Sequence, residues 1–160
     1  IGFCYGTFIR DKDAVGASMM VVEMAAYYKK QGKSLLDVLN DIYEEFGYYN
    51  ERQISLELEG IEGQQRIGRM MEDFRENPIE EMGDISLKEI IDFKDGYLDF
   101  PKQNCLKYYL NDGSWYALRP SGTEPKIKLY IYTIGKTEKE SIDKLDLIEK
   151  ACREKMNNVK

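Results

Sequence analysis

Histidine is missing from this 160-residue sequence, and cysteine is scarce. Without an imidazole, the chain cannot form a Ser-His-Asp or Cys-His catalytic arrangement from its own residues, and most zinc sites are excluded too. The three cysteines, Cys4, Cys105 and Cys152, lie far apart, without the spacing of metal ligands or of a disulfide framework. Isolated reduced thiols are typical of cytoplasmic proteins, so a cytoplasmic location is expected.

Positive charge is also in deficit, because 23 lysines and arginines face 29 aspartates and glutamates, giving a net charge of -6. A basic surface of the kind that binds nucleic acid is therefore not expected. No signal peptide is seen, and no apolar run approaches about 18 residues, the length that a membrane span needs. We expect neither a nucleic-acid nor a membrane partner, and any anion site must be built locally.

The chain does contain enough apolar sequence for a packed core, with 42% hydrophobic and 32% charged residues. Its length allows one domain, or one domain and part of another. The first residues read Ile-Gly-Phe-Cys and do not include a methionine. We therefore expect a piece of a longer protein.

Two helices are predicted in the first 46 residues. Asp13 can cap the first, which Gly32 can end, and Ser34 with Asp37 can cap the second. The first helix is apolar nearly all round, with Glu23 as its one charge before the final lysines. Such a helix is normally buried on several sides, and nothing else in the chain looks able to cover it completely.

The pattern changes after residues 47–52, "GYYNER", which we interpret as a linker. The next segment, "QISLELEG", alternates apolar and polar residues as a half-buried strand does. A helix is predicted over about 62–75, and a strand within 86–96. Two further strands flank Asn111-Asp112-Gly113, a hairpin signal, and "KIKLYIYT" forms the last strand.

A long amphipathic helix is predicted to close the chain. Thr137 and Glu140 form a capping box, and the expected core-facing residues are Ile142, Leu145, Ile148, Cys152 and Met156. The order of elements predicts an α+β fold, in which helices pack on one face of an antiparallel sheet and leave the other face free.

The loop "RPSGTEPK", Arg119 to Lys126, is the main candidate site. Arg119 offers a planar fork that suits two phosphate oxygens, and Ser121 and Thr123 offer hydroxyl donors. Gly122 lets the backbone turn so that successive N–H groups can point at one anion. Lys128 and the loop's own lysine add positive charge, so the parts together suit a phosphate monoester.

The same residues allow a plainer interpretation. Loops with Ser, Gly and Pro are common in hairpins, and Arg119 could simply pair with Glu124. A phosphate also usually lies at a helix N-terminus, and no helix follows this loop. Local composition leaves the two alternatives about equal.

A second candidate, "RDKDAV", spans Arg10 to Val15. Asp11 and Asp13 resemble the start of an Asp-x-Asp metal site, but no further ligands follow at useful spacing. Asp13 as a helix cap, with Asp11 favouring the helix dipole, is the stronger interpretation. No metal ligand is therefore predicted in this chain.

Taken together, these segments resemble the α-D-phosphohexomutases. "RPSGTEPKIKLYIYT" resembles the C-terminal phosphate-binding loop of that family and the strand after it. "GTFIRDKDAVGASMMVVEMAAYYKKQGKSLLDVLNDIYEEFGYY" resembles the end of the third domain, and "NCLKYYLNDGSWYALRPSGTEPK" is similar to the bacterial phosphoglucomutase/phosphomannomutase branch. The resemblance covers nearly the whole chain, in order.

The resemblance implies a four-domain enzyme of which this chain is the C-terminal fragment. Residues 1–46 would be the helical tail of the third, α/β domain, and 53–160 the fourth, TBP-like domain. A phosphoserine, an aspartate-rich Mg²⁺ loop and a Glu-Glu-Ser-type sugar loop belong to the other domains of the family, and none has a match here. We therefore expect no catalytic residue in the fragment, no activity of the fragment alone, and the missing N-terminal domains as its partners.

The resemblance also assigns residues. Arg119, Ser121, Gly122 and Thr123 match the positions that hold the non-transferring phosphate of the substrate. Lys128 stands where some relatives have an arginine that faces the same phosphate. Lys12 matches a lysine near the substrate, and it completes the implied set of site residues.

The implied reaction interconverts hexose 1-phosphate and 6-phosphate through the phosphoserine and a hexose 1,6-bisphosphate, with Mg²⁺. Glucose is the expected sugar and mannose the alternative. The rival hypothesis is a stand-alone α+β binding module whose cationic loop meets an acidic partner. Sequence upstream of residue 1 that carries serine and aspartate loops would distinguish the two.

Overall fold

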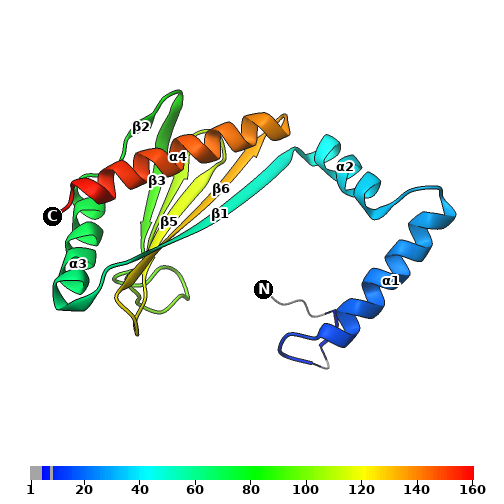
Figure 1. Ribbon diagram of the computed structural model, residues 1–160, viewed down its shortest axis with the longest axis horizontal. Coiled ribbons are helices and arrows are strands. Elements are labelled where there is room, and N and C mark those ends of the chain that lie inside the picture. The colour runs from blue at the N-terminus through cyan, green and yellow to red at the C-terminus, as the bar shows by residue number, and fades with distance from the viewer. Residues whose placement is uncertain (1–4, 8) are drawn as a thin grey trace. The chain divides into compact units, whose positions relative to one another are not determined.

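The structure is a computed structural model that describes residues 5–7 and 9–160 (Figure 1). Cys4 lies outside the described residues. The chain divides into two compact units, Ile1–Phe46 and Gly47–Lys160.

The first unit holds two helices, α1 (Ala14–Lys30) and α2 (Leu35–Phe46). Asp13 caps α1 as predicted, because the backbone N–H of Gly16 donates to its carboxylate at 2.9 Å. The apolar surface of α1 has no buried residue. Met19 and Val22, for example, are each 68% exposed. The helix is thus apolar and uncovered within its unit.

The predicted capping pair at the start of α2 is confirmed. The backbone N–H of Ser34 donates to the Asp37 carboxylate at 2.7 Å, and the N–H of Asp37 donates back to the Ser34 hydroxyl at 3.2 Å. Two of the donors that a helix start leaves unpaired are satisfied in this way.

The second unit is a six-stranded sheet with two helices. The strand order is β1-β6-β5-β4-β3-β2, and every neighbouring pair is antiparallel. The elements in chain order are β1 (Tyr48–Glu57), α3 (Gly60–Glu76), β2 (Glu81–Met82), β3 (Ile85–Asp92), β4 (Leu106–Leu110), β5 (Trp115–Pro120), β6 (Lys126–Gly135) and α4 (Glu138–Asn158).

The helices cover one face of this sheet, as the predicted α+β fold requires. In Figure 1, α4 lies along the strands and α3 packs near its C-terminal end. Every second residue of the central strands points into the core between these layers, which includes Tyr108, Tyr116, Leu118, Ile127, Leu129, Met70, Phe74, Ile148 and Cys152. Each fully buried aliphatic side chain contributes roughly 1.5–3 kcal/mol to folding.

The predicted linker at residues 47–52 is wrong beyond Gly47. Tyr48 to Arg52 form the first half of β1, paired with residues 131–135 of β6. The polar side chains that suggested a linker reach α4 instead. The Asn50 amide donates to the Ser141 hydroxyl at 2.6 Å, and the Arg52 guanidinium contacts the Asp146 carboxylate at 2.7 Å.

The C-terminal helix begins as predicted, since the N–H of Glu140 donates to the Thr137 hydroxyl at 3.1 Å. The Glu140 carboxylate accepts from the N–H of Lys136, so the reciprocal bond reaches one residue further back. Ile142 was expected in the core but is 37% exposed, whereas Ser141 is fully buried. The core positions Leu145, Ile148, Cys152 and Met156 are confirmed.

The far face of the sheet carries an aromatic group at one end. The Trp115 and Tyr132 rings stack at 5.4 Å across β5 and β6, and Tyr49 of β1 lies 5.7 Å from Tyr132. The Lys107 ammonium lies 4.0 Å from the centre of a Trp115 ring. These side chains cover much of that end, and the candidate site lies at the other.

Candidate functional site

Two cations face each other at the loop end of the sheet. Arg119 of β5 is paired in register with Lys128 of β6. Their neighbours Leu118 and Leu129 point into the core, so strand alternation places both cations on the helix-free face. Side chains directly opposite in an antiparallel pair have Cβ atoms about 5 Å apart. The two charges can therefore meet one ligand.

The connection between β5 and β6 is closed by its own hydrogen bonds. The N–H of Ser121 donates to the carbonyl of Lys126 at 2.8 Å, and the N–H of Lys126 donates to the carbonyl of Glu124 at 2.7 Å. The Ser121 and Thr123 hydroxyls lie 3.5 Å apart. These bonds give the loop a defined shape.

The backbone conformation of Gly122 differs from the one that the sequence interpretation assumed. Its φ is not in the positive range that glycine is needed for, and a Cβ added there would meet no atom within 4 Å. The loop backbone alone thus does not require glycine at this position. What Gly122 contributes is open space beside the loop.

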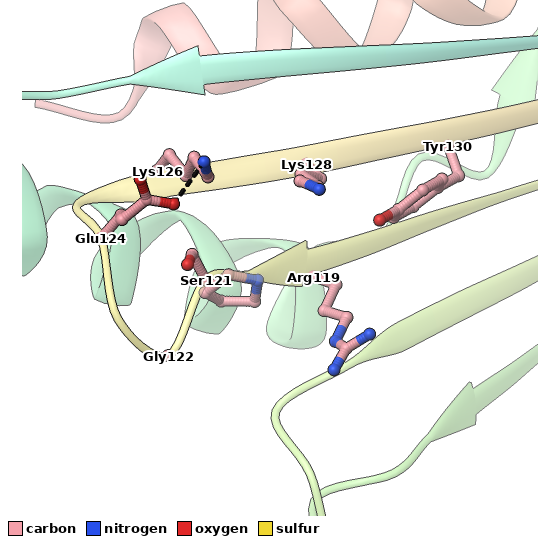
Figure 2. Close-up of a pocket in the computed structure, with 8 residues that line it drawn as sticks. Arg119, Ser121, Gly122, Glu124, Lys126, Lys128 and Tyr130 are labelled. Carbon is pink, nitrogen blue, oxygen red and sulfur yellow. Dashed lines mark ion pairs between the residues drawn. The ribbon is translucent and has the colours of Figure 1, made fainter. Parts of the chain in front are cut away.

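A hollow of about 250 Å³ opens beside the loop (Figure 2). It is lined by Arg119, Pro120, Ser121, Gly122, Glu124, Lys126, Lys128 and Tyr130. A second hollow, of about 420 Å³, lies on the α3 side of the same loop and shares several of these residues. A phosphate group is small enough to fit in the first hollow, whose lining is mostly polar.

The charges in the first hollow are unequal. Within the described part of the chain, neither Arg119 nor Lys128 has an ion pair, whereas Lys126 pairs with Glu124. The hydrogen bond to Glu124 raises the pKa of Lys126, and the same bond lowers the pKa of Glu124. The alternative in which Arg119 pairs with Glu124 is therefore wrong, and two cations stay available to an anion.

Most of the residues assigned from the sequence come together here. The hollow is lined by Arg119, Ser121, Gly122 and Lys128. Thr123 does not line it, but its backbone N–H donates to the Ser121 hydroxyl at 3.4 Å. Sequence reasoning missed Tyr130. The signal for it was present, because Tyr130 follows Lys128 by two residues and strand alternation puts both on the same face.

Lys12 belongs to the first unit, so the structure does not place it relative to the hollow. Its ammonium lies 2.8 Å from the Asp11 carboxylate, and its side chain is 68% exposed. A role for Lys12 near the substrate stays a prediction.

The thiols offer no activated nucleophile among the described residues. Burial raises the pKa of Cys105, although the nearby Arg119 charge acts against this, and burial raises the pKa of Cys152 strongly. Both are free thiols. A thiol with a raised pKa is a poor nucleophile at neutral pH.

Metal-ligand clusters and membrane-spanning helices are both absent from the described residues. No group of three or more Asp, Glu or Cys side chains is arranged to hold a metal ion there. No helix in residues 5–7 and 9–160 combines the length and apolar character needed to cross a membrane.

Comparison with known proteins agrees with this geometry. Residues 69–146 match the family model described as "Phosphoglucomutase/phosphomannomutase, C-terminal domain". This segment contains β3, β4, β5, β6 and the whole candidate loop.

Curated relatives give the same result over a longer stretch. A phosphoglucomutase of Staphylococcus aureus (strain MRSA252) is 40% identical over 141 residues, which cover 81% of this chain and 25% of the relative. A phosphoglucomutase of Staphylococcus epidermidis (strain RP62A) is 38% identical over the same share of the chain. The chain thus spans about a quarter of the length of these relatives.

A solved structure supports the fold. The open form of pp63/parafusin from Paramecium, a phosphoglucomutase by its description, superposes with a TM-score of 0.66 at 18% identity, covering 93% of this chain and 28% of that one. With the family match and the curated relatives, the resemblance is confirmed: this chain carries the C-terminal domain of the phosphoglucomutase/phosphomannomutase family.

Proposed function

We propose that the hollow beside the β5–β6 loop binds a phosphate monoester. The observation that carries this proposal is the pairing of Arg119 with Lys128 on one face, with no carboxylate partner for either in the described chain. Ser121 and Thr123 would add hydroxyl donors, and Arg119 can meet two phosphate oxygens at once. The loop shape is already fixed, which lowers the ordering cost of binding.

We further propose that the chain acts as the substrate-holding part of a phosphohexomutase that interconverts hexose 1-phosphate and 6-phosphate. The bond-making groups, a phosphoserine and bound Mg²⁺, would belong to other parts of the longer protein, as would the use of a hexose 1,6-bisphosphate. This domain needs no acid or base of its own. Arg119 and Lys128 would hold the non-transferring phosphate and orient the sugar.

Glucose phosphate is the favoured substrate, because the relatives at 38–40% identity are named phosphoglucomutases. Mannose phosphate is the alternative. The fragment alone is proposed to be inactive, its partners being hexose phosphate and the remaining domains. A cytoplasmic location is also proposed, supported by the free thiols of Cys105 and Cys152.

A titration of the 160-residue chain tests the binding proposal. Addition of inorganic phosphate or glucose 6-phosphate should shift the backbone amide NMR signals of Ser121, Gly122 and Thr123 before others. Arg119→Ala should weaken binding about tenfold or more, and Arg119→Lys should recover only part of the loss.

A matched control is Arg153→Ala, which removes an exposed arginine from α4, away from the hollow. If both arginine variants weakened phosphate binding equally, the loss would come from the change in net charge, and the proposal would be contradicted. A stand-alone module for an acidic partner would instead bind an acidic peptide more tightly than phosphate.

A further inference from the structure

One lining residue has the wrong charge for an anion site. Glu124 borders the same hollow as Arg119 and Lys128, and its carboxylate contacts the ammonium of Lys126 (Figure 2). Neither the family match nor the phosphate proposal explains a carboxylate here. A carboxylate is itself an oxyanion, so it can occupy a position that a phosphate oxygen would otherwise take.

The two partners of this pair are held differently. The Lys126 side chain is 21% exposed, whereas the Glu124 side chain is 58% exposed and belongs to the loop. Lys126 is the first residue of β6 and is paired in register with Glu57 of β1. The lysine is therefore the fixed partner, and the carboxylate can turn away into water without being buried.

Lys126 would not lose all of its support if Glu124 turned away. The charge of Glu57 also raises the pKa of Lys126, after the hydrogen bond and charge of Glu124. Glu57 does not line the hollow, so it stays beside the lysine without blocking a ligand. Lys126 therefore has a second carboxylate nearby, and could exchange Glu124 for a phosphate oxygen while remaining charged.

We propose that Glu124 is an internal competitor of the bound phosphate: it holds Lys126 in the ligand-free chain and releases it to the incoming phosphate oxygens. The inference rests on the proposed phosphate site. Its consequence is a weaker grip with faster release, because each binding event must break the Glu124–Lys126 pair.

A different role for the pair predicts the opposite sign. If Glu124 and Lys126 only clamp the loop in its binding shape, loss of the carboxylate loosens the loop and weakens phosphate binding. If Glu124 competes, its loss strengthens binding. The sign of the affinity change therefore separates a competing residue from a structural one.

The size of the effect follows from Coulomb's law. Removing one negative charge a few ångströms from a phosphate in a solvent-exposed hollow corresponds to about five- to tenfold in affinity. Removing a carboxylate of the same type that does not line the hollow should have a smaller effect, because water and salt screen it more fully.

The test compares Glu124→Gln with the matched control Glu57→Gln in the full 160-residue chain. Inorganic phosphate and glucose 6-phosphate serve as probes, at one ionic strength. NMR titration of the loop amides gives the Kd, and line-shape analysis of the same spectra gives the dissociation rate. Amide spectra of each free variant show whether β5 and β6 remain paired.

We expect Glu124→Gln to lower the Kd five- to tenfold and to slow dissociation by a similar factor, with Glu57→Gln changing the Kd less than twofold. An unchanged or raised Kd in Glu124→Gln overturns the inference, and so does an equal decrease in both variants. Failure of the phosphate site can be told apart from failure of this inference. If phosphate does not bind in this hollow, Arg119→Ala in the otherwise unaltered chain will not weaken any binding that the titration detects.

Discussion

Asn50 and Ser141 join the first strand of the sheet to the last helix. The Asn50 side-chain amide donates to the Ser141 hydroxyl at 2.6 Å, although 91 residues separate them in the chain. The backbone carbonyl of Ser141 accepts from the Thr133 hydroxyl at 2.8 Å, and both of these residues are fully buried. The three residues connect β1, β6 and α4 through side-chain and backbone hydrogen bonds.

Asn50→Ala should lower the free energy of unfolding by about 1 kcal/mol, because the Ser141 hydroxyl loses the amide that donates to it and keeps only its own bond to the Glu138 carbonyl. The control is Gln53→Ala, which truncates an exposed residue of the same strand. Denaturant unfolding followed by the fluorescence of Trp115, the single tryptophan, measures both. Equal effects of the two variants would mean that only strand propensity had changed.

The same network explains what the sequence could not reveal. Local signals were sufficient for the helix caps at Asp13 and Thr137 and for the hairpin at Asn111-Asp112-Gly113, because neighbouring residues determine them. The strand at 48–52 was missed because its polar side chains are paired with α4, a contact that no local pattern contains. Ile142 was misplaced for a similar reason, since Ser141 takes the buried position through its bonds to other elements.

At the candidate site, the loop residues were identifiable from their chemistry and from the resemblance. The arrangement of their charges was not. Glu124 contacts the Lys126 ammonium, and the backbone N–H of Lys126 also donates to the Glu124 carbonyl at 2.7 Å. The sequence interpretation considered only Arg119 as the partner of Glu124.

The stacked rings of Tyr108 and Tyr116 provide a matched pair of variants. Their centres lie 4.5 Å apart in the core, but only Tyr108 has a hydroxyl partner, the Phe74 carbonyl at 2.9 Å. The Tyr116 hydroxyl is buried without a hydrogen bond to the described residues. Tyr108→Phe should therefore lower the free energy of unfolding by about 1 kcal/mol, and Tyr116→Phe should leave it unchanged or raise it.

Thermal and denaturant unfolding of the two variants side by side measure this difference. Both changes remove one oxygen from neighbouring rings, so the loss of packing is the same in kind. A larger loss in Tyr116→Phe than in Tyr108→Phe would show that the Tyr116 hydroxyl is bonded after all, for example to buried water.

Glu149 should make the fold sensitive to acid. Its carboxylate accepts from Arg52 at 2.5 Å and from Arg153 at 2.6 Å, and the hydrogen bond from Arg52 holds its pKa below the ordinary value of 4.5. A carboxylate with a lowered pKa stabilises the fold above its unfolded pKa, and this stability is lost as pH falls through the folded pKa.

Glu149→Gln should therefore destabilise the chain by about 1 kcal/mol at pH 7 and make less difference as the pH falls below 4.5. Unfolding free energies measured from pH 7 to pH 3 test this convergence. The control is Asp143→Asn, which removes a carboxylate from an exposed ion pair with Lys139 on the same helix. A constant gap between wild type and Glu149→Gln at all pH values would contradict the assignment.

Tyr130 lines the candidate hollow beside Lys128. Figure 2 shows its hydroxyl directed toward the side of the hollow where Lys128 and Arg119 lie. Within the described chain this hydroxyl has no hydrogen bond of its own, so it can donate to a phosphate oxygen. Tyr130→Phe should weaken binding of glucose 6-phosphate to the 160-residue chain by about three- to tenfold, the scale of one hydrogen bond to a charged group.

Tyr132→Phe is the matched control, two residues further along the same face of β6. Its ring is stacked on Trp115 at 5.4 Å, at the aromatic end of the sheet, so removal of its hydroxyl should leave phosphate affinity unchanged. Both variants keep the ring and hence the packing, and the titration therefore isolates the hydroxyl. If Tyr130→Phe bound phosphate as tightly as Tyr132→Phe, the ligand would be held by the loop and its cations alone, and Tyr130 would be no more than a wall of the hollow.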